Sequence, residues 1–337
     1  MRLIERVWFE KHRARYVLVP LLLPLSGVFY VLSKLRKFAY KLGIKSSYQA
    51  NMPVIIVGNI GVGGNGKTPL VLWLVELLIA QGYKPGVIAR GYGGKAPHYP
   101  YLINSDSPVE YCGDEPYLIY HRTNVAVCVS PNRQQSIELL EKQGCNIIIA
   151  DDGMQHYKLN RDVEIAVIDG KRRLGNGFLL PAGPLREGSN RLNQTDYVIC
   201  NSGAAQQGEI TMSLTPGCFI NIGSDVKLSQ GDFMATYPRV NAIAGIGAPQ
   251  RFFDTLTSLG MKISHTQGFV DHHQYQASDF EQLPDAHLPV VMTEKDAVKC
   301  QHFNLLQAWY LTVDARLPEH FEHALLKKIA DVAIRKQ

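Results

Sequence analysis

The chain has 337 residues, a formal net charge of +5, 46% hydrophobic residues and 19% charged residues. This length predicts about two domains, and the composition excludes a disordered, a collagen-like or a multi-span membrane protein. Residues 1–45 hold ten Lys and Arg against two Glu, a local charge of +8, which leaves −3 for the rest of the chain. A basic footprint for nucleic acid over the whole surface is therefore not expected, and the basic segment favours a membrane surface.

The first apolar element covers residues 16–33, eighteen residues without a charge and with basic residues on both sides. A straight helix of this length spans about 27 Å, just short of the ~30 Å hydrocarbon core of a bilayer. Pro20 and Pro24 would each remove a backbone donor from such a helix. A retained anchor or interfacial helix is favoured, with a buried core helix or a cleaved signal as alternatives. The signal is disfavoured because the run leads into Lys34 and Arg36 rather than into small residues.

From residue 53 onward, apolar runs of four to six residues alternate with Gly-rich turns and stretches of helical periodicity. The predicted strands are 53–60, 86–90, 125–129, 146–150, 163–169 and 196–201, and the predicted helices are 68–81 and 130–144. This alternation predicts an α/β fold with a mostly parallel, doubly wound sheet and helices on both faces.

A second α/β pattern follows a stretch, residues 209–237, whose short Thr-, Ser- and Gly-rich pieces predict a linker hairpin. The second pattern has strands at 240–247 and near 290 and 310, and helices at 250–259 and 320–335. We therefore expect an N-terminal membrane-associating segment over 1–45, a core domain over 46–225 and a smaller α/β domain over 226–337.

The strongest motif is a phosphate loop at residues 61–68, which lies directly after one predicted strand and opens one predicted helix. Backbone N–H groups of such a loop curl around phosphate oxygens, and the helix N-terminus adds positive potential. Lys67 would reach the β- and γ-phosphates, and Thr68 would bind Mg²⁺. The expected nucleotide-binding residues of the loop are Gly61, Gly63, Gly64, Asn65, Gly66, Lys67 and Thr68.

Asp151 and Asp152 follow the apolar strand 146–150, at the edge where a doubly wound sheet places its ligand crevice. In phosphate-loop proteins a carboxylate at this place holds Mg²⁺ or its water. The alternative is an Asp pair that caps the next turn. Since adjacent carboxylates repel each other, a bound cation would explain why both stand at a strand end.

Three further motifs are ambiguous on their own. Residues 113–116 (Gly-Asp-Glu-Pro) are more typical of a solvated helix start than of catalysis. The His pair in residues 271–273 lacks nearby Cys or Glu spacing and is more typical of a surface or core than of a metal site. Residues 90–94 either bring Arg90 to an anion or only shape a turn.

Six cysteines are scattered without paired spacing or a CxxC motif, which predicts reduced thiols in a reducing compartment. They are Cys112, Cys128, Cys145, Cys200, Cys218 and Cys300.

Taken together and in this order, the motifs resemble those of the tetraacyldisaccharide 4′-kinases of lipid A synthesis. The matching segments are 58–69, 90–94, 113–116, 151–156, 179–187 and 270–273, after a basic, apolar N-terminus. The resemblance implies transfer of the ATP γ-phosphoryl group to the 4′-hydroxyl of a tetraacylated glucosamine disaccharide 1-phosphate, giving lipid IVA. It also implies Mg²⁺ as a cofactor and association with the bacterial inner membrane, and the expected reduced thiols favour its cytoplasmic face.

The resemblance implies roles for individual residues as well. Asp114 would accept the proton of the attacking hydroxyl, with His272 as its partner, and Asp151 and Asp152 would hold Mg²⁺ with Thr68. Contacts to nucleotide, magnesium-bound water or lipid phosphate are expected from Gln155, Arg90, Arg133, His156, Arg186 and Glu187.

The phosphate loop leaves two other functions open. A membrane-attached regulatory or partitioning-type ATPase often has an additional Lys early in the loop, where this chain has Gly61 and Val62. A guanine-nucleotide switch needs Asn/Thr-Lys-x-Asp, and residues 293–296 (Thr-Glu-Lys-Asp) have the letters in the wrong order, so ATP is favoured. The expected partners are the lipid disaccharide 1-phosphate and an anionic membrane surface, with no nucleic acid and no protein partner inferred.

Overall fold

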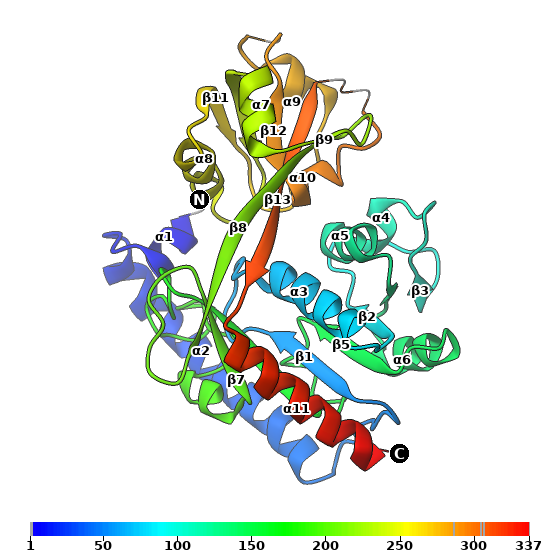
Figure 1. The fold of residues 1–337 in the computed structure, drawn as a ribbon. Helices are drawn as coiled ribbons and strands as arrows, with labels where there is room; N and C mark the ends of the chain where they lie inside the picture. Colours follow the sequence, from blue (N-terminus) through cyan, green and yellow to red (C-terminus); the bar gives the residue numbers. More distant parts are fainter. Residues whose placement is uncertain (1–2, 286, 304, 306, 337) are drawn as a thin grey trace.

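A computed structural model describes residues 3–285, 287–303, 305 and 307–336 of the chain (Figure 1). It has two lobes, and the larger one contains the first half of the chain. The strands of the larger lobe are β1 (Val54–Gly58), β2 (Pro85–Ala89), β3 (Tyr101–Leu102), β4 (Ala126–Val129), β5 (Ile147–Asp151), β6 (Val163–Asp169) and β7 (Tyr197–Asn201). Its helices are α3 (Lys67–Ala80), α4 (Val109–Cys112), α5 (Asp114–Thr123), α6 (Arg133–Lys142) and the 3₁₀-helix η1 (Ser189–Gln194).

The second half of the chain adds a smaller lobe, two connecting strands and a terminal helix. Its strands are β8 (Ile210–Asn221), β9 (Lys227–Leu228), β10 (Arg239–Ala244), β11 (Lys262–Gly268), β12 (Val290–Thr293) and β13 (Ala308–Arg316). Its helices are α7 (Gln230–Thr236), α8 (Pro249–Ser258), α9 (Ala277–Glu281), α10 (Glu294–Ala297) and α11 (Glu319–Lys336). In the described part of the chain these strands and those of the larger lobe join in one sheet, ordered β11-β10-β12-β13-β8-β7-β6-β1-β5-β2-β4-β3, with β9 beside β8.

The larger lobe is a parallel sheet covered on both faces. Strands β4, β2, β5, β1, β6 and β7 are paired in parallel, and only the short β3 pairs antiparallel within this lobe's described strands. Ile55 and Val57 face a core with α3, α5 and α11, whereas Val54 and Ile56 face one with α6. Because both faces are buried, these strands are continuous apolar runs. The expected mostly parallel α/β sheet is confirmed.

Strands β8 and β13 connect the lobes as a two-stranded antiparallel ribbon (Figure 1). The first residues of β8 extend the parallel sheet of the larger lobe beside β7, and the later ones pair with β13 in the smaller lobe. The stretch expected to be a linker hairpin is thus one twelve-residue strand that turns back into β9. Phe219 and Phe233 stack in the smaller lobe's own core, with ring centroids 4.0 Å apart.

The final helix, α11, returns to the larger lobe. Phe321 stacks on Trp73 of α3 at 5.7 Å between ring centroids, and Leu325 and Ile329 lie in the core that α3 shares with the sheet. The packing therefore differs from the expected 226–337 domain, because α11 contributes its apolar face to the larger lobe. The boundaries themselves stay a prediction.

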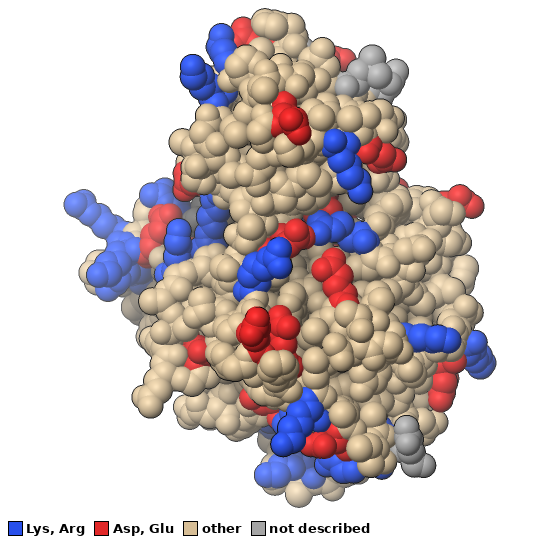
Figure 2. All heavy atoms as spheres, viewed as in Figure 1, with Lys and Arg blue, Asp and Glu red and all other residues tan. Residues whose placement is uncertain are grey.

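Two N-terminal helices, α1 (Leu3–Phe9) and α2 (Arg15–Lys41), lie along the larger lobe (Figure 1). Helix α2 continues through both prolines, and its most apolar stretch has a mean hydropathy of 1.9 with 6% of that stretch buried. Ser26 anchors it by donating to the carbonyl of Leu179 and accepting from the amide of Ala182. Helix α2 is therefore not a buried core helix. Lys and Arg side chains gather at the side of the molecule where α1 lies (Figure 2).

Candidate active site

The candidate residues lie where the parallel strands of the larger lobe end and the smaller lobe faces them. A cleft of about 1850 Å³ opens there, larger than the roughly 300–1,000 Å³ of a typical small-molecule pocket. Every candidate residue named from the sequence lines this cleft except Gly61, which forms an isolated bridge with Leu185 behind the loop. The volume suits two substrates side by side better than one nucleotide alone.

The phosphate loop joins β1 to α3, and two of its glycines have backbone angles that other residues rarely adopt. Gly63 has φ 105° and Gly66 has φ 87°, and α3 begins directly afterwards at Lys67. Asn201, the last residue of β7, supports the loop because its Nδ2 donates to the carbonyl of Asn65 at 3.1 Å. A Cβ at Gly66 would collide with this Asn201 side chain. Sequence reasoning missed Asn201, whose signal is a buried polar residue that ends an apolar strand.

The Asp pair stands at the end of β5, beside the phosphate loop. Asp152 Oδ1 lies 3.5 Å from Lys67 Nζ, and its Oδ2 accepts from Arg186 at 2.9 Å. Burial alone would raise the pKa of Asp152, but the charges of Lys67 and Arg186 lower it. Arg186 thus stabilises the ionised form of Asp152, and Asp152 in turn holds the Lys67 side chain beside the phosphate loop.

Asp151 is buried, and its Oδ1 has no hydrogen-bond partner in the described part of the chain. Its pKa is raised by burial and by the neighbouring charges of Glu115 and Asp152. Arg133, nearly fully buried, donates from Nη2 to the backbone carbonyls of Asp151 and Asp152 at 2.7 and 3.0 Å. Arg133 therefore fixes the turn that carries the carboxylates.

Gln155 and Glu187 form a second layer behind the Asp pair. Gln155 Nε2 donates to the Asn59 carbonyl at 3.0 Å and to Glu187 at 2.9 Å. Glu187 also accepts from the Tyr157 hydroxyl, which sequence reasoning missed. His156 lines the cleft nearby, and its pKa falls to about 4 because of burial and the charge of Arg133. His156 is thus neutral at physiological pH.

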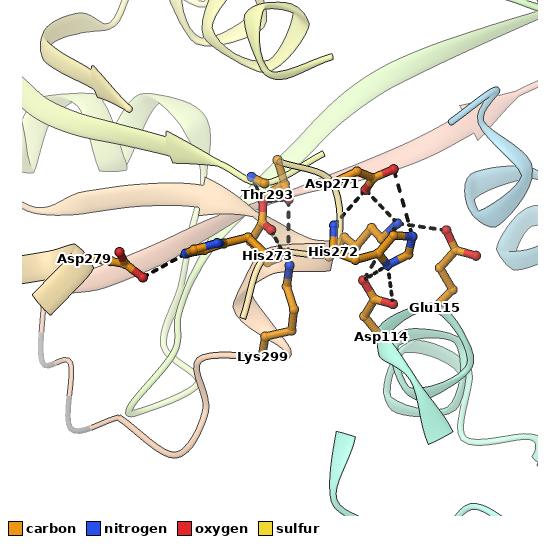
Figure 3. Close-up of polar contacts among 11 residues, drawn as sticks. Asp114, Glu115, Asp271, His272, His273, Asp279, Thr293 and Lys299 are labelled. Carbon is orange, nitrogen blue, oxygen red and sulfur yellow. Dashed lines mark hydrogen bonds and ion pairs between the residues drawn. The ribbon is translucent and has the colours of Figure 1, made fainter. Parts of the chain in front are cut away.

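Asp114 and His272 meet across the lobe boundary (Figure 3). Asp114 begins α5 in the larger lobe, and His272 lies in the loop after β11 in the smaller lobe, with φ 61°. His272 Nδ1 lies 3.1 and 3.0 Å from the two carboxylate oxygens of Asp114. Although burial would raise the pKa of Asp114, the His272 hydrogen bond and the Lys295 charge lower it to about 2. The hydrogen bond with Asp114 raises the pKa of His272.

Lys295 joins this group, and sequence reasoning did not assign it a role in catalysis. Its Nζ lies 2.9 Å from Glu115, 3.4 Å from Asp271 and 3.8 Å from Asp114. The neighbouring His273 instead pairs with Asp279 at 2.9 Å, away from the cleft (Figure 3). Lys295 lies in the 293–296 segment, whose residue order does not match a guanine-recognition motif.

Two further candidates, Arg90 and Thr68, also line the cleft. Arg90 is exposed at the end of β2, next to Tyr92, whose ring lies 5.8 Å from that of His272. Thr68 stands in the first turn of α3, beside Lys67.

The residues at the end of β5 fit a magnesium ion. Oxygen ligands suit Mg²⁺, which is usually held by one or two carboxylates together with substrate phosphates and water. Among the described residues no group of three or more His, Cys, Asp or Glu could hold a metal by itself. The orphaned Asp151 Oδ1 and the raised pKa of Asp151 are features that a divalent cation would satisfy and offset.

Comparisons with known proteins agree on one family. The family model of tetraacyldisaccharide-1-P 4′-kinase matches residues 18–330. A tetraacyldisaccharide 4′-kinase of Colwellia psychrerythraea is 54% identical over 323 residues, covering 94% of this chain and 93% of the relative. One of Aliivibrio fischeri is 49% identical over 330 residues, covering 98% and 99%.

A solved structure agrees with the fold. The crystal structure of "apo" form LpxK from Aquifex aeolicus in complex with ATP is similar with a TM-score of 0.77 and 28% identity, covering 93% of this chain and 100% of that one. The expected resemblance and the phosphate-loop fold are thereby confirmed. The chain belongs to the tetraacyldisaccharide-1-P 4′-kinase family.

Proposed function

We propose that this chain transfers the γ-phosphoryl group of ATP to the 4′-hydroxyl of a tetraacylated glucosamine disaccharide 1-phosphate, giving lipid IVA. The observation that carries the proposal is the extent of the cleft. One continuous space is lined by the phosphate loop, by Asp114 and His272, and by Phe29, Tyr30 and Lys37 on α2. A lipid held at the flank of α2 can therefore present its sugar to the same cleft that holds ATP.

The residues divide the work of phosphoryl transfer, which consists mainly of positioning and of neutralising charge. The loop backbone and Lys67 hold the β- and γ-phosphates. Asp114 is ionised at the pH of the reaction because its pKa is low, and it accepts the proton of the hydroxyl as that hydroxyl attacks phosphorus. His272 orients that carboxylate through its Nδ1 and stabilises its charge.

Mg²⁺ would be held by Asp151 and Asp152 together with Thr68, and when bound it supplies positive charge to the phosphates of ATP. Arg133 and Arg186 keep the two carboxylates in place. Gln155 and Glu187 support the same turn from behind. Arg90 and His156 line the same cleft and would contact the lipid's sugar or phosphate.

The test is transfer of labelled γ-phosphate from ATP to a tetraacyldisaccharide 1-phosphate in detergent, with and without Mg²⁺ and with an acceptor-free control. We expect magnesium-dependent labelling of the lipid. Phosphate release without acceptor and without a lipid product would favour the regulatory ATPase instead. Labelling that does not depend on added Mg²⁺, after treatment with a chelator, would contradict the metal assignment.

We also propose that α2 binds the cytoplasmic face of the inner membrane. Leu21, Leu25 and Val28 are each more than half exposed on the outer side of a helix that has basic residues at both ends. Such a helix gains from apolar burial in lipid and from attraction to anionic headgroups. ATP and reduced cysteines, of which all six are free, suit the cytoplasmic side.

Replacing Leu21, Leu25 and Val28 together by Ser tests the membrane proposal. We expect the chain to move from the membrane pellet to the supernatant, while its circular dichroism spectrum remains that of the folded chain. The control is the exposed substitution Ile334→Ser on α11, which lies outside the apolar stretch of α2. An unchanged distribution of the triple variant would contradict the anchor.

A further inference from the structure

The segment 293–296, which lacks the residue order of a guanine-recognition motif, has a place in the fold that suggests another use. Thr293 ends β12 and caps the short helix α10 by accepting from the amide of Asp296 at 3.2 Å. This turn faces the first turn of α5, where Asp114 and Glu115 lie. Lys295 thus extends from the smaller lobe to the larger one at the point where the proposed proton acceptor stands.

The backbone that carries Lys295 is held rigidly from behind. Asp296 is fully buried and accepts from the Gly245 amide at 2.9 Å, from the Thr293 hydroxyl at 2.6 Å and from Lys299 Nζ at 2.8 Å. A buried carboxylate whose two oxygens both accept hydrogen bonds restrains the loop around it. The backbone of Lys295 is therefore held in a defined position, and its side chain, which is only 18% exposed, is restrained by its neighbours.

Three carboxylates converge on the Lys295 ammonium group, two from the larger lobe and one from the smaller. Glu115, Asp271 and Asp114 lie 2.9, 3.4 and 3.8 Å from Nζ. Carboxylates gathered around one ammonium group repel one another, and this repulsion is stronger in a partly buried cleft than in water. Without Lys295, three negative charges would stand together at the place where a polyphosphate must approach.

Asp114 is held from two directions. His272 contacts both of its oxygens, and Lys295 lies beyond Oδ2. We propose that Lys295 is a positioning residue for phosphoryl transfer, which holds Asp114 in register with His272 across the lobe boundary and balances the charge of the surrounding carboxylates. The proposal rests on the proposed kinase function and adds a residue to it. Lys295 acts through Asp114 and touches no reacting atom.

The ionisation states agree with this geometry. Burial would lower the pKa of Lys295, but Glu115, Asp114 and Asp271 outweigh burial and raise it. The groups facing Asp114 are His272 and Asp271 from the loop after β11, Lys295 and Lys299 from the α10 region, and Glu115 from its own helix. Both Lys295 and Asp114 are therefore charged throughout the pH range of an enzyme assay.

A second ion cluster at the lobe boundary offers a matched control. Arg122 on α5 pairs with Glu294, the neighbour of Lys295, at 2.8 Å, and also with Asp314 on β13. Its side chain is 19% exposed, close to the 18% of Lys295. Arg122 thus bridges the same two lobes with similar burial but makes no contact with Asp114 in the described structure.

The experiment measures kcat, KM for MgATP and for the lipid, and Tm for the full chain in detergent with four substitutions: Lys295→Met, Lys295→Arg, Arg122→Met and Asp114→Asn. We expect Lys295→Met to lower kcat about 30-fold while KM for the lipid changes less than about threefold. Lys295→Arg should recover to within about fivefold of the unaltered chain, since charge is restored. Arg122→Met should lower Tm at least as much as Lys295→Met does, with kcat within about threefold of that of the unaltered chain.

The decisive measurement is the double variant. If Lys295 acts through Asp114, adding Lys295→Met to Asp114→Asn should lower single-turnover rates by no more than about threefold further. Full additivity of the two losses, or a kcat for Lys295→Met within about threefold of the unaltered chain, would overturn the inference. Equal kcat losses in Lys295→Met and Arg122→Met would also overturn it, because both residues would then only hold the two lobes together. No lipid product from the unaltered chain would instead overturn the proposed function and this inference with it.

Discussion

The two ends of the cleft are built in different ways. At one end, the phosphate loop and the Asp151–Asp152 pair come from neighbouring strands of a single parallel sheet, and Asn201 and Arg133 fix them from the same lobe. At the other end, Asp114 belongs to the larger lobe and its partner His272 to the smaller. The first end is held by one hydrophobic core, and the second depends on how two cores pack against each other.

This difference separates two kinds of failure. Damage at the phosphate-loop end removes an interaction with the nucleotide and leaves the lobe boundary intact. Damage at the Asp114 end changes the chemistry, the lobe packing or both, because charged contacts there serve as structure as well as site. Measuring kcat, KM and Tm for the same variant therefore distinguishes damage at the two ends of the cleft.

The largest effect is expected at Lys67. Lys67→Met removes the cation that reaches the β- and γ-phosphates, and we expect kcat/KM for ATP to fall about 10³-fold. Asp152 loses one neighbour at 3.5 Å but keeps Arg186, so Tm should change by less than about 2 °C. Phosphate-transfer kinetics and thermal unfolding check both parts. The exposed Lys84→Met serves as control, and a Lys67→Met variant with a kcat/KM within tenfold of normal would remove Lys67 from the mechanism.

The next effect is expected at Asp114. Asp114→Ala removes the proposed proton acceptor, and we expect kcat to fall about 10²-fold or more with KM for ATP little changed. The matched control is Glu110→Ala, an exposed carboxylate in α4 just before the same turn. Near-normal turnover in Asp114→Ala would refute the assignment, and a large rise in KM for ATP would place Asp114 at the nucleotide rather than at the acceptor.

These two predictions differ in how far the sequence alone supports them. The loop residues 61–68 are contiguous, and strand-loop-helix context is a local property, so their position could be predicted from pattern. Asp114 and His272 are 158 residues apart. Nothing in their local sequence distinguishes them from a solvated helix start and a surface histidine, so only the family resemblance paired them.

Other features of the fold also depend on tertiary contacts that sequence patterns do not show. The twelve-residue β8 has mixed Thr, Ser and Gly because it passes from one lobe to the other and is only partly covered. Helix α11 is amphipathic, and its periodicity predicts a buried face but not which lobe it contacts. Lys295 and Asn201 owe their positions to strand ends brought together by the sheet, which is tertiary information.

A third prediction concerns stability at the lobe boundary. Burial raises the pKa of Glu294, and Arg122 is the cation that offsets this. Arg122→Met would leave that carboxylate nearly buried without its partner, so we expect a loss of about 2 kcal/mol, or a Tm lower by about 3 °C. The control is Arg239→Met, which breaks the exposed 3.7 Å pair with Asp285 and should cost less than about 0.5 kcal/mol. Similar losses in both variants would mean that the Arg122 cluster does not hold the lobes together.

The smallest effect is a pH dependence of stability that originates at the second end of the cleft alone. The hydrogen bond with Asp114 outweighs burial and raises the pKa of His272 in the folded chain. A raised histidine pKa contributes stability that is fully present below the unfolded value of about 6.5 and is lost as pH rises through the folded value. Asp114, with its pKa lowered to about 2, contributes stability above about pH 4 that is lost as pH falls toward 2.

The two contributions overlap between about pH 4 and pH 6.5, so His272→Asn should lower Tm more at pH 5 than at pH 9. The difference should be on the order of 2 °C, because His272 is about one-third exposed and solvent screens the pair. His320→Asn, an exposed histidine on α11, is the control for the substitution itself. If the Tm difference of His272→Asn is the same at both pH values, His272 does not gain charge through Asp114 when the chain folds. The contact across the lobes would then be one of packing, and the contrast between the two ends of the cleft would lose its electrostatic basis.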